Sequence, residues 1–291
     1  MKRANDRTPG FVLEEIGMGV HGPVVVGVDG SEWSKLAAEW AVQEADLRKA
    51  VQVCFVMATE DPSLDETARD TVGPLTEGLA DRHPTLKISS DVVHGEPADV
   101  LLRWSADAQL LVVGSRGRSS LGATLLGSVS AKAATHAQCP VIVIRGRRDT
   151  GPVVVGLDNS PHSSAALKFA FDSASRYGCE LRAVQVWQDP EYAPVVPRLG
   201  WELIDLRAEA VRGLAEQLAG WTESYPDVTF HKVAQRGHPV AELAAAADDA
   251  RLLVVGHRGR GGFTGLLLGS VAAGVIHHAQ CPISVVRGVN P

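Results

Sequence analysis

The chain has 291 residues, of which 45% are hydrophobic and 21% are charged, and its formal net charge is −6. This length suffices for about two domains, each with its own buried core. The sequence has neither the concentrated basic segment that binds nucleic acid, nor an apolar run of roughly 20 residues that could cross a bilayer, nor the apolar start of a secretory signal. Composition therefore predicts a cytoplasmic protein without nucleic-acid or membrane partners.

The first half of the chain reads as alternating strands and helices. Residues 1–22 show no hydrophobic periodicity and are expected to form a tail. Strands are expected at 23–31, 51–57, 87–95, 110–114 and 140–146, and helices at 31–49, within 60–83, at 97–106 and at 128–136. Short β-branched runs between helical segments are typical of parallel sheets buried on both faces. Residues 23–147 are therefore predicted to form an α/β domain with right-handed crossovers.

The second half repeats the same order of elements. The run at 152–160 matches 23–31, and 181–187 matches the second strand. The offset between the copies then grows from 129 to 142, so the second half holds about 13 extra residues. They lie mainly at 188–201, before a strong helical pattern at 202–221. Residues 152–288 are predicted to be a second, homologous domain, because a unit of this length buries its own core.

Each half contains one copy of a glycine-rich segment, at 110–128 and at 252–270. The glycines, with the serine that follows the last of them, are Gly114, Gly117, Gly127 and Ser128 in the first copy and Gly256, Gly259, Gly269 and Ser270 in the second. Glycine permits positive φ and close approach of a ligand to the backbone, and successive N–H groups form an anion-binding nest. Because the last glycine opens a helix, the segment predicts a phosphate-binding loop.

Charged residues stand beside these loops. Arg116 and Arg258 put positive charge next to the glycines, and Asp29 and Asp158 end the first strand of each half. A carboxylate at a strand end is well suited to accept hydrogen bonds from ribose hydroxyls. The plainer alternatives stay open: the aspartates cap helices, the arginines are solvated, and the loop is a turn. Whether the aspartates and the loops are neighbours depends on strand order, which the sequence does not give.

Other chemistry is not indicated by the motifs present. The Gly-Lys-Ser/Thr ending of an ATPase P-loop, the H-E-x-x-H metal spacing and a recognisable catalytic triad are absent from the sequence. The four cysteines form no C-x-x-C pair. Two of them, Cys139 and Cys281, stand at equivalent positions before prolines and are expected to be buried. No catalytic and no metal-binding residue is predicted.

The spacing G-x2-G-x9-G-S, with VGVDGS and VGLDNS after the first strands and CPVIVIRG and CPISVVRG as last strands, resembles the universal stress protein family. The resemblance covers 23–147 and 152–288, in the tandem layout of actinobacterial members and with the glycines of the ATP-binding branch. It implies two Rossmann-like α/β domains, each a five-stranded parallel sheet of order 3-2-1-4-5 with helices on both faces. It also implies one adenine nucleotide per domain, ATP with or without Mg²⁺.

The resemblance also assigns roles. Asp29 and Asp158 would contact ribose or adenine, Val56 and Val186 at the ends of the second strands would contact the base, and the glycines and serines would hold ribose and phosphates. The family associates through its last strand, so 140–145 and 282–287 are expected to pair domains, and a homodimer of the tandem chain is expected. The second copy departs from the first at His257, where the first has Ser115.

The function expected from these features is that of an ATP-binding regulator of growth or stress survival, with an unidentified protein partner. Two alternatives remain. One is a slow ATP hydrolase or nucleotide transferase, and the other is a scaffold that folds in the same way and binds no nucleotide.

Overall fold

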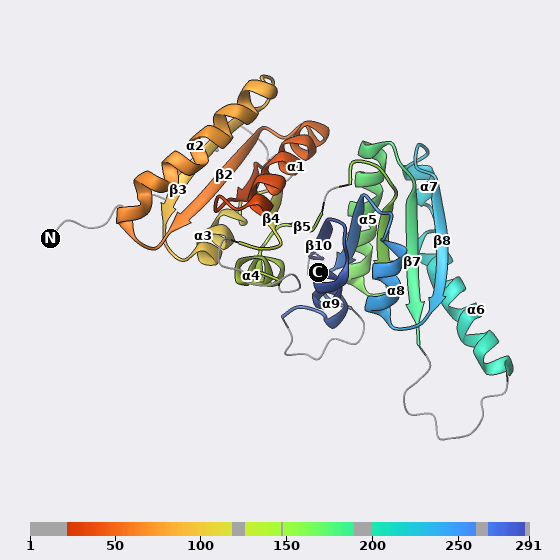
Figure 1. The fold of residues 1–291 in the computed structure, drawn as a ribbon. Coiled ribbons are helices and arrows are strands. Elements are labelled where there is room, and N and C mark those ends of the chain that lie inside the picture. The colour runs from red at the N-terminus through yellow and green to blue at the C-terminus, as the bar shows by residue number, and fades with distance from the viewer. Residues whose placement is uncertain (1–21, 118–125, 147, 189–199, 260–266, 289–291) are drawn as a thin grey trace.

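The computed structural model describes residues 22–117, 126–146, 148–188, 200–259 and 267–288 (Figure 1). The expected N-terminal tail, except Gly22, lies outside these residues, as does most of the insertion at 188–201. The central parts of both glycine-rich loops, 118–125 and 260–266, also lie outside them.

Every strand expected from the sequence is found, and most are shorter at one or both ends. The first half consists of β1 (Val24–Gly27), α1 (Glu32–Arg48), β2 (Gln52–Thr59), the 3₁₀ turn η1 (Pro62–Leu64), α2 (Asp65–Arg82), β3 (Lys87–His94), α3 (Pro97–Trp104), β4 (Leu110–Gly114), α4 (Ser128–His136) and β5 (Val141–Ile144). The second half consists of β6 (Val153–Leu157), α5 (Pro161–Tyr177), β7 (Leu181–Trp187), α6 (Gly200–Gln217), α7 (Trp221–Ser224), β8 (Phe230–Arg236), α8 (Pro239–Ala246), β9 (Leu252–Gly256), α9 (Ser270–His278) and β10 (Ile283–Val286).

The single helix expected at 202–221 is wrong in its extent. The structure ends α6 at Gln217, and Gly220 takes a φ of 81° before Trp221 begins the short helix α7. A residue in this left-handed region ends an α-helix, and glycine enters it without steric cost. The break therefore follows from a glycine that the helical periodicity on both sides conceals.

All ten strands form one sheet, in the order β3-β2-β1-β4-β5-β10-β9-β6-β7-β8. Each half has the order 3-2-1-4-5 with parallel neighbours, as predicted. The halves join where β5 and β10 pair antiparallel, with Val143 opposite Ile283. The last strands therefore pair the two halves within one chain, and the free edges of the sheet are β3 and β8 (Figure 1).

Two hydrophobic cores lie on the two faces of the sheet, and each runs through both halves. Helices α1, α2, α5 and α6 cover one face, and α3, α4, α8 and α9 cover the other (Figure 1). Strands buried on both faces need apolar residues at nearly every position, which explains the unbroken valine and leucine runs of the sequence. Among the helices that the structure describes, none has the length and apolarity to cross a membrane.

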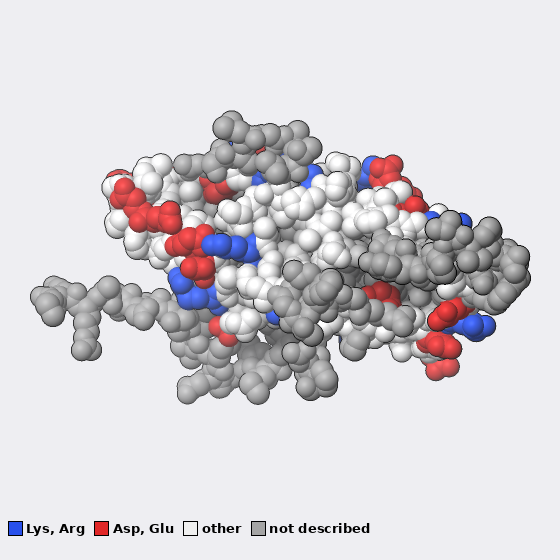
Figure 2. All heavy atoms as spheres, turned by 90° about the horizontal axis from the view of Figure 1, so that it is seen from below, with Lys and Arg blue, Asp and Glu red and all other residues white. Residues whose placement is uncertain are grey.

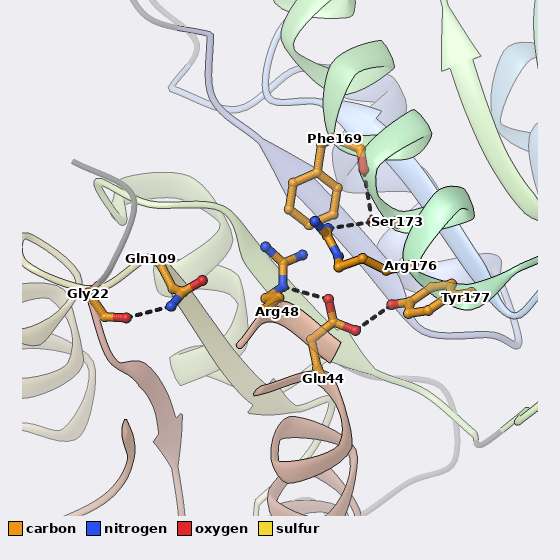
Figure 3. Close-up of polar contacts among 8 residues, drawn as sticks. All are labelled: Gly22, Glu44, Arg48, Gln109, Phe169, Ser173, Arg176 and Tyr177. Atoms are coloured by element: carbon orange, nitrogen blue, oxygen red, sulfur yellow. Dashed lines mark hydrogen bonds and ion pairs between the residues drawn. The ribbon is translucent and has the colours of Figure 1, made fainter. Parts of the chain in front are cut away.

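A buried polar cluster links α1 of the first half to α5 of the second. Figure 3 shows Glu44 of α1 between Arg48 of the same helix and Tyr177 of α5. Its carboxylate accepts hydrogen bonds from Arg48 Nε at 2.5 Å and from Tyr177 Oη at 2.6 Å. The Arg48 guanidinium also lies 4.8 Å from the centroid of the Phe169 ring. The halves are therefore held together on this face by charge and aromatic contacts as well as by the strand pair.

On the face covered by α4 and α9, an arginine of each half donates hydrogen bonds to carbonyls at the end of a helix of the other half. Arg145, just after β5, donates from Nη1 to the carbonyls of Ile276 and His277 at the end of α9, at 2.6 and 2.7 Å. Arg287, at the equivalent position after β10, donates from Nη2 to the carbonyl of Thr135 in α4 at 2.6 Å. Because the last carbonyls of a helix lack intrahelical donors, each half stabilises a helix end of the other.

Candidate functional site

The strand register brings each aspartate to its glycine-rich loop. β1 pairs with β4, with Val26 opposite Val112, and β6 pairs with β9, with Val155 opposite Val254. In a parallel sheet the carboxyl ends of neighbouring strands meet at one edge, which is where open α/β sheets bind ligands. The structure thus supplies the adjacency that the sequence left undecided, and it does so in both halves.

The contact between aspartate and loop is direct. A Cβ added to Gly117 would lie 2.7 Å from Asp29 Oδ2. A Cβ added to Gly259 would overlap Asp158 Oδ2 in the same way. Only glycine leaves room for the carboxylate at this point, so the spacing of the second glycine has a steric reason in both loops.

The other oxygen of each aspartate is held at the start of the next helix. Asp29 Oδ1 accepts from the Ser31 backbone N–H at 3.0 Å, and Asp158 Oδ1 accepts from that of Ser160 at 3.1 Å. The N-cap itself is Ser31 in α1 and Ser160 in α5. The capping interpretation of the aspartates is therefore partly correct. This bond leaves the other oxygen of each carboxylate directed at the loop glycine.

The last glycine of each loop opens a helix. Gly127 N–H donates to the Ser115 carbonyl and Gly269 N–H to the His257 carbonyl, both at 2.9 Å. Gly127 and Gly269 are the N-caps of α4 and α9. Since glycine has no side chain, no side-chain group of the N-cap satisfies the first-turn N–H groups, which suit an anion. The exposed Ser128 and Ser270 are the first residues of these helices.

The two loop arginines differ in their surroundings. The Arg116 guanidinium lies 4.7 Å from the centroid of the Trp33 ring, which holds it beside the loop. Gly114, where the loop begins, approaches the backbone of the same tryptophan so closely that a Cβ would lie 2.8 Å from the Trp33 carbonyl oxygen. Arg258 of the second loop is exposed. The first-half cation is therefore positioned by an aromatic contact, whereas the second is solvated.

The expected equivalence of Val56 and Val186 is wrong. Val24 of β1 lies opposite Val53, and the equivalent Val153 of β6 lies opposite Leu181, so Val53 corresponds to Leu181. An alignment that matches Val56 with Val186 is two residues away from this one. Val56 is 1% exposed and lies three residues before the end of β2. The residue equivalent to Val186 is Ala58. A slip of two keeps every side chain on its face, so the sequence pattern does not reveal it.

The second half has a cavity of about 250 Å³ where β6 and β7 end. We call it the β7–α6 pocket, and it is lined by Asp158, Asn159, Gln185, Val186, Trp187, Leu206, Glu209 and Ala210. It thus brings together Asp158 and Val186, two of the residues predicted from the sequence. Four polar lining residues were not predicted: Asn159, Gln185, Trp187 and Glu209. The signal available was a glutamine between two valines near the end of β7.

Another hollow, of about 400 Å³, lies between α5 and α7 and is lined by Lys168, Ala219, Gly220, Trp221, Ser224 and Tyr225. It includes no residue from a strand end or a glycine-rich loop, so it is not the candidate site despite its larger volume. Figure 2 shows the molecule from below Figure 1. In the part not drawn grey, lysines and arginines stand beside acidic residues instead of forming one continuous basic surface.

His257 joins the second loop to the first half. Its side chain is 3% exposed, and Nε2 lies 2.9 Å from the Thr135 carbonyl oxygen and 3.1 Å from Arg287 Nη2. Burial, together with the neighbouring arginines, lowers the pKa of His257 from 6.5 to about 4. Since its backbone carbonyl also holds Gly269, this neutral histidine ties the start of α9 to the domain interface. In the part of the chain that the structure describes, no group of three or more His, Cys, Asp or Glu side chains could hold a metal ion.

Comparisons with known proteins agree with this architecture. The family model described as "Universal stress protein family" matches residues 21–145 and 150–287. A universal stress protein of Mycolicibacterium smegmatis is 38% identical over 287 residues, covering 91% of this chain and 96% of the relative. One of Mycobacterium tuberculosis is 38% identical over 290 residues, covering 92% and 97%. The crystal structure of a universal stress protein from Archaeoglobus fulgidus superposes with a TM-score of 0.69 at 20% identity, covering 94% of this chain and 99% of that one, which shows the shared fold.

Proposed function

Because the chain belongs to the universal stress protein family, we propose that it binds one adenine nucleotide in each half and acts as a cytoplasmic regulator of growth or stress survival. ATP, with or without Mg²⁺, is the proposed ligand. The nucleotide serves as a signal that changes the conformation or the partner of the protein.

The observation that carries this proposal is the duplicated contact between an aspartate and a glycine. In both halves a carboxylate oxygen lies against the second glycine of the loop, while a helix opened by glycine begins close by. A carboxylate accepts hydrogen bonds from ribose hydroxyls, and free helix N–H groups attract phosphate. The two requirements of a nucleotide, a polyol and a polyanion, are therefore met side by side.

The remaining assignments follow from position. Gly114, Gly117, Gly127 and Ser128 hold ribose and phosphates in the first half, as do Gly256, Gly259, Gly269 and Ser270 in the second. Arg116 and Arg258 supply positive charge at the loops. Asp29 and Asp158 bind the ribose, and Val186 contacts the base.

The proposal is tested first by denaturing freshly purified protein and quantifying the adenine nucleotide released per chain. About two per chain are expected, and ATP should raise the melting temperature of emptied protein by mass action. The double variant Gly117→Glu, Gly259→Glu should lose both effects, because its new side chains meet the aspartates. Gly78→Glu is the matched control, because a Cβ there meets nothing within 4 Å.

Three results would overturn parts of this proposal. Protein that carries no nucleotide and shows no ATP-induced stabilisation supports the scaffold alternative. Phosphate release well above about 1 s⁻¹ from purified protein supports the enzyme alternative, since that is the range of ordinary enzymes. Unchanged binding in the double glycine variant would show that the ligand sits elsewhere.

A homodimer is part of the same proposal. The last strands already pair within the chain, so self-association would use another surface, and we propose the edge strands β3 and β8 of the described sheet. Sedimentation of the full chain distinguishes a monomer from a dimer.

A further inference from the structure

Two buried polar atoms of the β7–α6 pocket have no hydrogen-bond partner among the residues that the structure describes. They are Oε1 of Gln185 and Nε1 of Trp187. Gln185 is 8% exposed, and both residues line the cavity. Buried donors and acceptors in proteins are nearly always paired, and leaving one unpaired is costly. An unpaired acceptor and an unpaired donor that line the same cavity point to a bound molecule that forms hydrogen bonds with both.

The volume of the pocket limits what that molecule is. At about 250 Å³ it is far larger than the roughly 30 Å³ that one water occupies in the liquid. It is also somewhat smaller than the roughly 300–1,000 Å³ of sites that enclose a whole drug-sized ligand. The pocket therefore fits one ring system, with the rest of the ligand outside it.

The charge of the lining limits the ligand further. Asp158 and Glu209 contribute carboxylates, and none of the eight lining residues is a lysine or an arginine. The two carboxylates disfavour an anionic group among the lining residues, and the Arg236 guanidinium lies outside the lining, 5.8 Å from the centroid of the Trp187 ring. We therefore place the phosphates at the glycine-rich loop. The pocket offers oxygen acceptors from Gln185 and the two carboxylates, while the Trp187 indole N–H only donates. A flat heteroaromatic ring with an amino group beside a ring nitrogen acceptor, such as adenine, satisfies both orphaned atoms.

The first half is built differently at the equivalent positions. When β2 and β7 are aligned by their pairing with β1 and β6, Gln185 corresponds to Met57 of the first half, and Trp187 corresponds to Thr59. Met57 is 5% exposed and belongs to the hydrophobic core, and the Thr59 hydroxyl already donates to Asp65 Oδ1 at 2.5 Å. At these two positions the first half thus has no unpaired side-chain group that could hydrogen-bond the ring of a ligand.

We propose that Gln185 and Trp187 are specificity-determining residues of the second half, which hydrogen-bond the amino-substituted ring of its ligand in the β7–α6 pocket, whereas the first half holds its ligand without such reading. This inference rests on the proposed function, since it concerns the base of the same nucleotide. It makes the two halves unequal in selectivity, with the second half recognising adenine and the first tolerating other bases.

The test compares ATP with purine riboside triphosphate, which lacks only the 6-amino group. Titration calorimetry on Gly117→Glu protein isolates the second site, and titration on Gly259→Glu protein isolates the first. The second site should prefer ATP by about tenfold, the worth of one hydrogen bond to a buried group. Gln185→Met, which introduces the residue of the first half, should reduce this preference to about twofold or less and should not lower the melting temperature of the empty protein. Trp187→Phe, which removes the donor, should weaken binding of both ligands.

The matched control is the first site, where Gln185→Met should change neither affinity. An unchanged preference for ATP at the second site in Gln185→Met, or unchanged affinity for both ligands in Trp187→Phe, would overturn the inference while leaving the proposed function standing. Absence of ATP binding in the unmodified chain would overturn both.

Discussion

Replacing Glu44 by leucine tests how the two halves are held together. The side chain of Glu44 is 2% exposed, and its two oxygens accept one hydrogen bond from Arg48 and one from Tyr177 of the other half. Leucine removes both acceptors at similar volume. The Arg48 guanidinium, whose side chain is 9% exposed, then stays buried without a counter-charge. Its Nη2 already has no partner among the described residues.

The expected loss of stability is set by the groups left behind. Breaking a buried ion pair by removing one partner costs about 3–5 kcal/mol, and part of that reflects the unpaired tyrosine hydroxyl. The matched control is Glu32→Leu in the same helix. Glu32 pairs with Lys35 at 2.7 Å, but its side chain is 83% exposed. An exposed pair of this kind contributes about 0–1 kcal/mol.

Urea denaturation followed by circular dichroism measures both variants. The free energy of unfolding should fall several times more for Glu44→Leu than for Glu32→Leu. Adding Arg48→Leu to Glu44→Leu should restore part of the loss, because an apolar pair no longer leaves a charge buried. Equal losses in the two single variants, or a double variant less stable than Glu44→Leu, would refute the view that a desolvated charge network joins α1 to α5.

Three further predictions concern other described residues. Arg145→Met should cost about 3 kcal/mol and Arg287→Met about half as much by the same denaturation assay, because the buried Arg145 loses two charged hydrogen bonds to carbonyls and the exposed Arg287 loses one; a larger loss for Arg287→Met would contradict this. His257 has its pKa lowered from 6.5 to about 4, so the unfolded chain alone binds this proton between those values and stability falls as pH decreases through that window. His257→Asn should therefore lose less melting temperature between pH 7 and pH 5 than the unmodified protein, and an equal loss would disprove it. Burial raises the pKa of the Cys139 thiol to about 12, so mass spectrometry after iodoacetamide treatment at pH 8 should find the half-buried Cys179 alkylated before Cys139 in folded protein, and the reverse order would count against this buried placement.

The order of elements could be predicted because the central strands are buried on both faces, whereas the strand order within each half was implied by the family resemblance. Runs such as Leu110–Gly114 and Leu252–Gly256 carry almost no polar residue, which distinguishes them from the helices around them. The resemblance implied that the last strands pair domains, and the structure adds that β5 and β10 of one chain pair with each other and do so antiparallel. Edge pairing between domains depends on which strand end is left uncovered, and that is a property of the assembled sheet.

The parts of the candidate site that depend on residue spacing along the chain could be predicted. The parts that depend on how the second strand aligns with the first could not. The glycine spacing is shared by both halves because a side chain at Gly117 or Gly259 meets an aspartate oxygen. Val56 and Val186, in contrast, were matched two residues out of register, since alternation with a period of two hides such a slip. The polar residues of the β7–α6 pocket come from β7, from α6 and from the turn after β6, so only the folded structure brings them together.

The two halves share the contact between the aspartate and the loop glycine, and they differ in the residues near the end of the second strand. The carboxylate and the second glycine of each loop depend on one another sterically, because any side chain at that glycine would meet the carboxylate oxygen. The second-strand positions that face α2 or α6 pack against a helix rather than against the loop, and they carry Met57 and Thr59 in one half and Gln185 and Trp187 in the other. Exchanging the two residues at these positions between the halves should exchange the selectivity for the base. The contacts proposed for ribose and phosphate should not change in either half. Calorimetry on the isolated sites, with the loop glycine of the other half replaced by glutamate, measures this directly, and loss of phosphate binding on exchange would show that the two functions are not separable.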